Sequence, residues 1–298
     1  MSRHSKEFQS DHPVTEDSRS RLADHPAGGA LHPVHGTVEA PILVVGATGT
    51  IGRAVVGALA TAGRPVVAVA PNPERLETLR LAHHEAAVTL RPGRILTDSD
   101  AAQLADELRA AGRPLGGVVV AIPAGVTGGR VLDHPVDDLR EQLDASLLPQ
   151  LAMARHLLPL LAESGRNGTY VMVGGPGSDA PWAGYGQRSI AMAALRMLAR
   201  VLHDEAQSLG VRVHLLSIDS PVRSEAPAAH ECPEWPTVSG VGRRVTQLIT
   251  RAHVDEATQT IVTCRRRTDQ AVSNAAQQPR RFRDVPTFLQ SLKTHTSK

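Results

Sequence analysis

Short apolar runs alternate with segments of helical periodicity along most of the chain, and this alternation restricts its fold more than any other feature. Residues 41–46 (PILVVG) form a continuous apolar run, which is typical of a strand buried on both faces. Apolar positions then recur at helical spacing over 50–62, and Gly63 ends that helix. A second apolar run over 65–70 and a helix opened by Pro73 repeat the pattern.

The same alternation continues to residue 263. The further strands are expected at 87–96, 116–122, 169–173, 211–217 and 259–263. The further helices are expected at 99–111 with Asp98 as N-cap, at 136–162 with an interruption at most by Pro149, at 182–209 and at 239–251. Strands that alternate with helices indicate a parallel sheet with helices on both faces. We therefore predict a single α/β domain over residues 41–263, with a doubly wound parallel sheet.

The two ends of the chain differ from this pattern. Residues 1–40 are rich in His, Ser, Pro and acidic residues and lack apolar periodicity, so we expect a disordered arm. Residues 264–298 carry clustered arginines, and we expect a solvated basic tail with a short helix near 285–293. Stacking on nucleic-acid bases needs interleaved aromatic side chains, and this tail offers only Phe282 and Phe288. With a formal net charge of +2, the chain is not expected to bind nucleic acid.

Composition excludes several other classes of protein. Two cysteines among 298 residues rule out a disulfide framework and a four-cysteine zinc site, and we expect no metal. No apolar run reaches the ~18 residues needed to cross a bilayer, so we expect no membrane partner. The N-terminal sequence lacks the apolar centre of a signal peptide, and we expect a cytoplasmic location.

A glycine-rich turn joins the first predicted strand to the first predicted helix. It reads Gly-Ala-Thr-Gly-Thr-Ile-Gly over 46–52. In such a turn the first glycine permits the tight bend, the middle glycine lets backbone approach a pyrophosphate, and the last lets helix pack on strand. The helix N-terminus then presents free N–H groups to the phosphates. No Gly-Lys-Ser/Thr follows, so the turn is not a nucleoside-triphosphate loop. We predict a dinucleotide site here.

The residues after the second strand normally select the cofactor. An acidic residue there binds a ribose 2′-hydroxyl, whereas an arginine accepts a 2′-phosphate. The chain has Ala70-Pro71-Asn72-Pro73 instead, so the choice between NAD and NADP stays open. The predicted cofactor-binding residues are Gly46, Thr48, Gly49, Thr50, Ile51, Gly52, Asn72, Ala121, Ile122 and Pro123.

Between residues 41 and about 263 the chain resembles the short-chain dehydrogenase/reductase superfamily. The matching landmarks are GATGTIG at 46–52, AIPAG at 121–125, Leu158-Pro159 in a long helix, Tyr185 near the start of the next helix, and VRVHLLSID at 211–219. The resemblance implies a Rossmann-type sheet and a nicotinamide cofactor. It also implies assembly through the two long helices expected at 136–162 and 182–209.

The catalytic pattern of that superfamily is only partly present. The resemblance implies that Tyr185 exchanges a proton with the substrate. In that superfamily a lysine four residues after the tyrosine lowers the pKa of the tyrosine. This chain has Ser189 at that position. The serine that orients the carbonyl falls in Met-Val-Gly-Gly at 172–175, and the asparagine of the long helix aligns with Ser146. Where that superfamily has Pro-Gly after the sixth strand, this chain has Ile218-Asp219. Tyr185 is thus the only predicted catalytic residue.

No shift of alignment can restore the lysine, because the lysines of the chain are Lys6, Lys293 and Lys298. Arg188 lies three residues after Tyr185, close on one helical face. Its charge could stabilise a phenolate, but a guanidinium stays protonated and cannot relay protons. A phenol without a cationic partner titrates near ~10.

Other candidates lie later in the chain. His214 stands within an apolar strand, where a satisfied core histidine is the ordinary finding. Asp219 and Arg223 follow the sixth strand and are expected either to contact substrate or to form a loop ion pair. Residues 219–237 are expected to form a mobile substrate lid, with Trp235 as its apolar anchor.

Two functions follow from this sequence. The leading prediction is an NAD(P)-dependent oxidoreductase acting on a small-molecule carbonyl or alcohol. The alternative is a relative that keeps the nucleotide-binding fold without ordinary hydride transfer, either a cyclase or dehydratase type of enzyme or a non-catalytic partner subunit. Both long helices carry broad apolar stripes, a surplus that tends to be buried between subunits. A homodimer or homotetramer is therefore expected.

Overall fold

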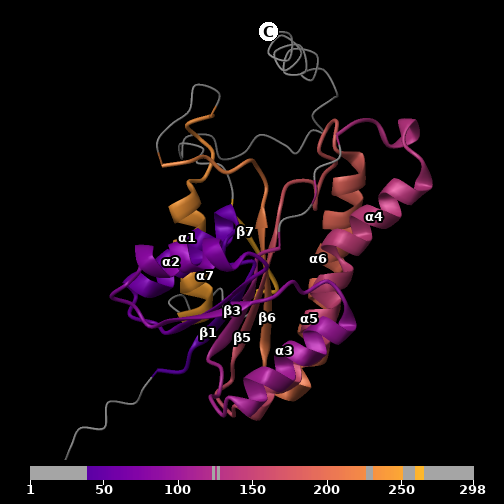
Figure 1. Cartoon of the computed structure of the whole chain (residues 1–298). Helices are drawn as coiled ribbons and strands as arrows, with labels where there is room; N and C mark the ends of the chain where they lie inside the picture. Colours follow the sequence, from indigo (N-terminus) through magenta and orange to yellow (C-terminus); the bar gives the residue numbers. More distant parts are fainter. Residues whose placement is uncertain (1–38, 123–124, 126–127, 226–230, 251–258, 265–298) are drawn as a thin grey trace, which may run out of the picture. The chain divides into compact units, whose positions relative to one another are not determined.

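A parallel sheet of seven strands forms the centre of the fold (Figure 1). A computed structural model describes residues 39–122, 125, 128–225, 231–250 and 259–264. The strands lie in the order β3-β2-β1-β4-β5-β6-β7, and every neighbouring pair is parallel. Their bounds are β1 Ile42–Val45, β2 Val66–Ala70, β3 Val88–Pro92, β4 Gly117–Val120, β5 Thr169–Gly174, β6 Arg212–Ile218 and β7 Ile261–Cys264. This is the predicted doubly wound Rossmann order, extended by β7.

Helices cover both faces of the sheet (Figure 1). On one face lie α1 Thr50–Thr61, α2 Pro73–Ala82 and α7 Val238–Thr250. On the other lie α3 Asp98–Ala110, α5 Leu148–Glu163 and α6 Gly186–Ala206, with α4 Val136–Ser146 leading into α5. Short 3-10 turns, η1 Val131–Asp133 and η2 Gln207–Leu209, precede α4 and follow α6.

The alternation of side chains along β1 explains why its sequence is apolar throughout. Leu43 and Val45 belong to the apolar core beneath α3, α5 and α6. Ile42 and Val44 belong to the second core beneath α1, α2 and α7. All four side chains are buried, because a parallel strand covered on both faces has no solvent-facing side. The prediction from the continuous apolar run is confirmed.

The long helix predicted at 136–162, with an interruption at most by Pro149, is divided in the structure into α4 and α5 at Leu147. The break has a physical reason in Pro149, which lies in the first turn of α5. A proline has no N–H to donate and its ring crowds the carbonyl four residues earlier, whereas it fits well in a first helical turn. Pro159 lies inside α5 at an exposed position and does not end it.

The start predicted for the next helix at 182 is wrong, since α6 begins at Gly186. Residues 182–185 form a turn in which the N–H of Tyr185 donates to the carbonyl of Trp182 at 2.9 Å. Gly184 in this turn has φ +76, a left-handed conformation that a continuing right-handed helix excludes. The turn matters below, because Trp182 and Tyr185 lie beside the candidate site.

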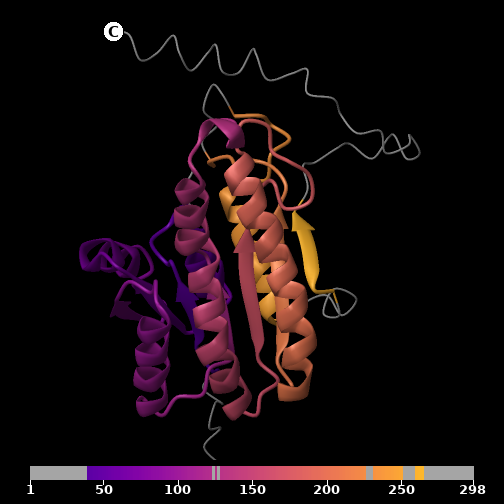
Figure 2. The same ribbon diagram turned by 90° about the vertical axis from the view of Figure 1, so that its right-hand side faces the viewer.

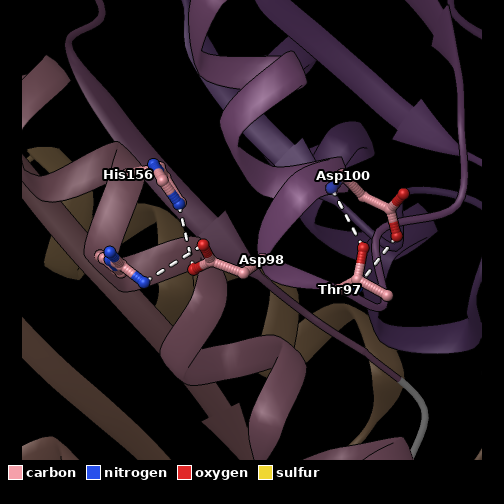
Figure 3. A network of polar contacts seen from close by, with 5 residues as sticks. Thr97, Asp98, Asp100 and His156 are labelled. Carbon is pink, nitrogen blue, oxygen red and sulfur yellow. Dashed lines mark hydrogen bonds and ion pairs between the residues drawn. The ribbon is translucent and has the colours of Figure 1, made fainter.

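Thr97, rather than the predicted Asp98, is the N-cap of α3 (Figure 3). Its hydroxyl accepts from the N–H of Asp100 at 3.2 Å, and the carboxylate of Asp100 accepts from the N–H of Thr97 at 2.9 Å. This reciprocal pair is a capping box. The carboxylate of Asp98 instead lies 3.1 Å from Nε2 of His156 and 3.2 Å from Nη1 of Arg155. Asp98 therefore joins α3 to α5.

Candidate cofactor and active site

The candidate site lies where the strand order of the sheet reverses. β1 pairs with β2 on one side and with β4 on the other, so the connections leave β1 and β4 in opposite directions. Ligands of open α/β sheets bind at the carboxyl ends of the strands at such a point. The glycine turn 46–52 follows β1 there, and Ala121 and Ile122 follow β4.

The three glycines of the turn differ in what surrounds them. Gly46 has φ +81, and a Cβ there would lie within 3.0 Å of the backbone carbonyl of Ala121. A Cβ at Gly52 would lie within 3.0 Å of the carbonyl of Gly46. Both glycines are therefore required by the fold itself. At Gly49 the one neighbour of an added Cβ would be the carbonyl oxygen of Gly46 at 3.3 Å, so this middle glycine borders open space.

The open space lies at the positive end of α1. Gly49 is the N-cap of this twelve-residue helix, and no side chain caps it. The carbonyl of Thr48 accepts from Nη1 of Arg53 at 2.8 Å, which adds a positive charge beside the turn. Free N–H groups and the helix dipole at such an end favour a phosphate. We call this space, bordered by Gly49 and the start of α1, the glycine cradle. A Cβ at Gly49 would narrow it, and without one it fits the diphosphate of a dinucleotide.

The remaining predicted cofactor residues lie in different surroundings. Asn72 lies at the carboxyl end of β2, where its side-chain oxygen accepts from the N–H of Arg75 at 2.8 Å and caps α2. Ala121 is buried and its carbonyl lies against Gly46. Ile51 and Ile122 both line a cavity beside the cradle. Pro123 lies outside the described residues.

A cavity of about 320 Å³ opens at the carboxyl ends of β4, β5 and β6. Its walls are mainly apolar, with Val173, Met192 and Ile218 among them. Its polar lining comes from four different elements or loops and includes Gln150, Arg188 and Ser220. Sequence analysis missed Gln150 and Ser220. The signal that could have found Gln150 is an amide inside an apolar helical stretch, LPQLAMA.

Gln150 and Ser220 are deeply buried polar residues. Each is 1% exposed. Neither Oε1 of Gln150 nor Oγ of Ser220 has a hydrogen-bond partner among the residues that the structure describes. Because buried polar groups are nearly always hydrogen-bonded in folded proteins, two such oxygens in one cavity indicate a place for a polar ligand.

Arg188 brings a positive charge into the same cavity. Burial lowers the pKa of its guanidinium, and the nearby Tyr185 phenol opposes that shift. Its Cζ lies 5.7 Å from the centre of the Trp182 ring, within the range of a cation–π contact. A Cβ at Gly175 would lie within 3.0 Å of Nη2 of Arg188. Gly175 therefore makes room for this arginine.

Tyr185, the predicted catalytic residue, lies beside the cavity but is not among its described lining residues. It is the N-cap residue of α6, and its ring stacks on Trp182 with centroids 4.2 Å apart. The other tyrosine, Tyr170, is fully buried in the core, and burial raises its pKa. Tyr185 is thus the one phenol placed near the site.

Ser189 and Ser146, which the resemblance aligns with a lysine and an asparagine, bind to the backbone. Ser189 is 7% exposed. Its hydroxyl accepts from the N–H of Trp182 at 2.9 Å and donates to the carbonyl of Tyr185 at 3.0 Å. The hydroxyl of Ser146 donates to the carbonyl of Gln142 at 2.6 Å. Neither serine is free to take over the proton chemistry of the residue it replaces.

The remaining sequence candidates take structural positions. His214 is a core histidine, whose Nδ1 lies 2.7 Å from the carbonyl of Gln259. Nε of Arg223 donates to the carbonyl of Trp235 at 3.1 Å, which ties together the two ends of the expected lid. Residues 226–230 of that segment, 1–38 of the expected arm and 265–298 of the expected tail lie outside the described residues.

Two negative observations hold for the part of the chain that the structure describes. No group of three or more His, Cys, Asp or Glu side chains there is arranged to hold a metal ion. No described helix combines the length and the apolar character needed to cross a membrane.

Comparison with known proteins identifies the family. The model of the family described as short chain dehydrogenase matches residues 40–225, more than half of the chain. This protein therefore belongs to the short-chain dehydrogenase family. A comparison with curated protein sequences finds no match.

Solved structures share the fold at low sequence identity. A short-chain dehydrogenase/reductase from Mycobacterium ulcerans has 19% identity and a TM-score of 0.67, covering 75% of this chain and 87% of its own. A metagenomic short-chain oxidoreductase in complex with NADP has 19% identity and a TM-score of 0.65, covering 78% and 99%. An alcohol dehydrogenase from the archaeon Thermococcus sibiricus, complexed with 5-hydroxy-NADP, has 15% identity and a TM-score of 0.65, covering 76% and 97%.

Proposed function

We propose that this chain binds NAD or NADP in the glycine cradle and acts as an oxidoreductase on a small-molecule carbonyl or alcohol. The observation that carries the proposal is the open space over Gly49 at the uncapped end of α1. Family membership supports it. So do the solved relatives whose structures hold NADP and 5-hydroxy-NADP. The choice between the two dinucleotides stays open, because Asn72 and Arg75 give no clear charge preference after β2.

Different residues of this chain would have different roles in such a reaction. The N–H groups at the start of α1 bind the diphosphate, and Ile51 and Ile122 form apolar walls that exclude water from the reacting centre. A bound nicotinamide supplies or accepts the hydride. Tyr185 donates the proton to the alkoxide that forms on carbonyl reduction. The guanidinium of Arg188 lies near enough for its charge to interact with that phenol.

A second function is favoured by a specific observation. No lysine lies between residues 7 and 292. The hydroxyl of Ser189 is hydrogen-bonded within the turn before α6. The chain thus combines the glycine cradle with a serine at the position where the resemblance places the lysine. This combination favours a dinucleotide-binding relative that performs a non-redox reaction, or that serves as a partner subunit.

Calorimetric titration of the full chain with NADH and with NADPH tests the proposal. We expect saturable binding of at least one of them. Gly49→Val should abolish that binding, because its side chain enters the space of the diphosphate, while thermal unfolding still shows a folded protein. Gly57→Ala, farther along the same helix, is the matched control and should bind as wild type. Absence of binding to both nucleotides would overturn the proposal.

A screen of carbonyl compounds then separates the two functions. Oxidation of the bound reduced nucleotide, followed by its absorbance, supports the oxidoreductase. Binding of the nucleotide without turnover of any carbonyl compound supports the second function.

We also propose that the protein forms a homodimer or homotetramer through the outer face of α5 and α6, which run side by side (Figure 2). Large apolar side chains are exposed along this face: Leu148 47%, Leu151 44%, Ile190 42%, Met197 56% and Val201 45%. A groove of about 800 Å³ runs between α3, α5 and α6 on the same face. Such a surface is typical of a subunit contact. The cytoplasmic location stays a prediction.

A further inference from the structure

We propose that the 320 Å³ cavity takes an uncharged hydroxy ketone, with Gln150 binding the hydroxyl group of this substrate and Ser220 its carbonyl oxygen. The inference rests on the proposed function, because it names the substrate class of the same site. It depends on three observations: two buried oxygens without partners, the different hydrogen bonds that these oxygens can make, and the apolar character of the remaining lining.

Gln150 and Ser220 are brought into one cavity by separate parts of the fold. Gln150 lies in the first turn of α5, and Ser220 follows the end of β6. Each residue is 1% exposed, and neither Oε1 of Gln150 nor Oγ of Ser220 has a hydrogen-bond partner among the described residues. A buried polar group without a hydrogen bond is energetically unfavourable. Both oxygens therefore favour a ligand that pairs with them.

The two oxygens require different groups on that ligand. The amide oxygen of a glutamine can only accept, so Oε1 of Gln150 needs an O–H or N–H group. A serine hydroxyl can donate, so Ser220 can bind a carbonyl oxygen. A simple ketone pairs with Ser220 and leaves Oε1 of Gln150 unpaired. A ketone that also carries a hydroxyl group pairs with both residues.

The rest of the lining favours a ligand without charge. Its walls are mainly apolar, with Val173 and Met192 among them, and no acidic side chain belongs to its described residues. Arg188 is half-buried, lies against the ring of Trp182, and has its charge near the Tyr185 phenol. An ammonium donor would be repelled by this guanidinium, and a carboxylate would lose its hydration among apolar side chains. A hydroxyl group supplies the donor without either cost.

The competing occupant is the carboxamide of a nicotinamide, which also offers donors and an acceptor. The glycine cradle lies at the start of α1, and α1 and α5 cover opposite faces of the sheet. Ser220 follows β6, which β4 and β5 separate from β1. This placement favours the substrate as the partner of Gln150 and Ser220, and the test below separates the two ligands.

Matched ketones test the inference by binding alone. The probes are 3-hydroxy-2-heptanone and 4-hydroxy-2-heptanone, each beside its methyl ether, with 2-heptanone as their common parent and 2-oxoheptanoate as a charged analogue. The full-length protein is titrated with each probe, with and without NADPH or NADH, and binding is followed by ligand-observed NMR. We expect at least one hydroxy ketone to bind at least tenfold more tightly than its ether, 2-heptanone and the charged analogue.

Gln150→Leu should weaken binding of that hydroxy ketone at least tenfold and leave binding of 2-heptanone unchanged. Ser220→Ala should weaken binding of both ketones by the same factor, because both carry the carbonyl group. Gln103→Leu, at an exposed position of α3, is the matched control and should behave as wild type. If Gln150→Leu does not fold, Ser220→Ala and the wild-type comparison of hydroxy ketone with ether still decide the matter.

Dinucleotide calorimetry on the same variants distinguishes this inference from the proposed function. Loss of hydroxy ketone binding with full dinucleotide affinity in Gln150→Leu supports the inference. Equal loss of both ligands assigns Gln150 to the nicotinamide carboxamide and overturns it. Equal affinity for hydroxy ketone and ether, tighter binding of 2-oxoheptanoate, or no response to either hydroxy ketone while NADPH or NADH binds normally also overturns it. Tight hydroxy ketone binding without affinity for either dinucleotide would count against the proposed function instead.

Discussion

The same substitution at two helical glycines should change stability in opposite directions. Gly57 lies in α1, where a new Cβ would meet Cε1 of the His83 side chain at 3.3 Å. Gly242 lies in α7 where it crosses α1, and a Cβ there would lie within 3.0 Å of the backbone carbonyl of Ala54. The first neighbour is the end of a side chain and can move, whereas the second is helix backbone.

Magnitudes decide the sign in each case. Alanine in a helix interior is more favourable than glycine by about 0.8–1 kcal/mol. At Gly57 most of that gain remains, and we expect the free energy of unfolding to rise by roughly 0.5–1 kcal/mol. At Gly242 the two helices must separate, and overpacking costs about 1–3 kcal/mol. Because backbone has to move, we take the upper half of that range, so the net loss is about 1–2 kcal/mol.

Thermal unfolding followed by circular dichroism, with urea unfolding beside it, measures both effects. One kcal/mol shifts Tm by about 2–4 °C in a domain of 150–250 residues. Gly57→Ala should therefore raise Tm by about 1–4 °C, and Gly242→Ala should lower it by about 2–8 °C. A rise in Tm for Gly242→Ala similar to that for Gly57→Ala would refute the close contact between α1 and α7.

Three further predictions concern pH, catalysis and assembly. Burial lowers the pKa of His214, so its contribution to stability is complete above the ordinary histidine pKa of ~6.5 and is lost as the pH falls below it. Urea unfolding from about pH 7.5 to 5 should therefore show a steeper loss for wild type than for His214→Asn, with the exposed His84→Gln as control; equal slopes would contradict this. Tyr185→Phe should reduce carbonyl reduction by about 10²–10⁴ with unchanged dinucleotide affinity, and a loss below tenfold would remove Tyr185 from the mechanism. Leu151→Glu should dissociate the assembly, and light scattering that gives the 31.7 kDa monomer mass for wild type as well would show that no assembly forms.

The sequence was sufficient for the parts of the fold that depend on local pattern. The apolar run of β1 and the glycines that follow it could be assigned because burial on both faces and a forced backbone conformation leave direct traces in residue type. The late start of α6 was missed, and the division of α4 from α5 was foreseen only as a possible interruption at Pro149. Helical periodicity continues through Pro149 and Gly184, whereas the hydrogen bonds there do not.

The candidate site, too, could be predicted from the sequence only in part. The cradle lies within seven consecutive residues, so its chemistry can be read along the chain. The cavity joins Gln150, Arg188 and Ser220, which are far apart in sequence and meet only through the register of β5 and β6 and the packing of α5 and α6. A lone glutamine or serine gives no sign in sequence that its oxygen will be buried without a partner.

The two hydrogen bonds of Ser189 have a consequence for the redesign of this protein. A lysine at position 189 would remove the bonds that hold residues 182–185, and it would press on Gly177, where an added Cβ would lie within 3.0 Å of the Ser189 hydroxyl. It would also release Trp182 from beneath Arg188. A lysine at position 189 therefore conflicts with the turn that holds Trp182 beside Arg188. An engineer returning to the lysine would therefore have to rebuild the turn and the loop at Gly177 together with position 189.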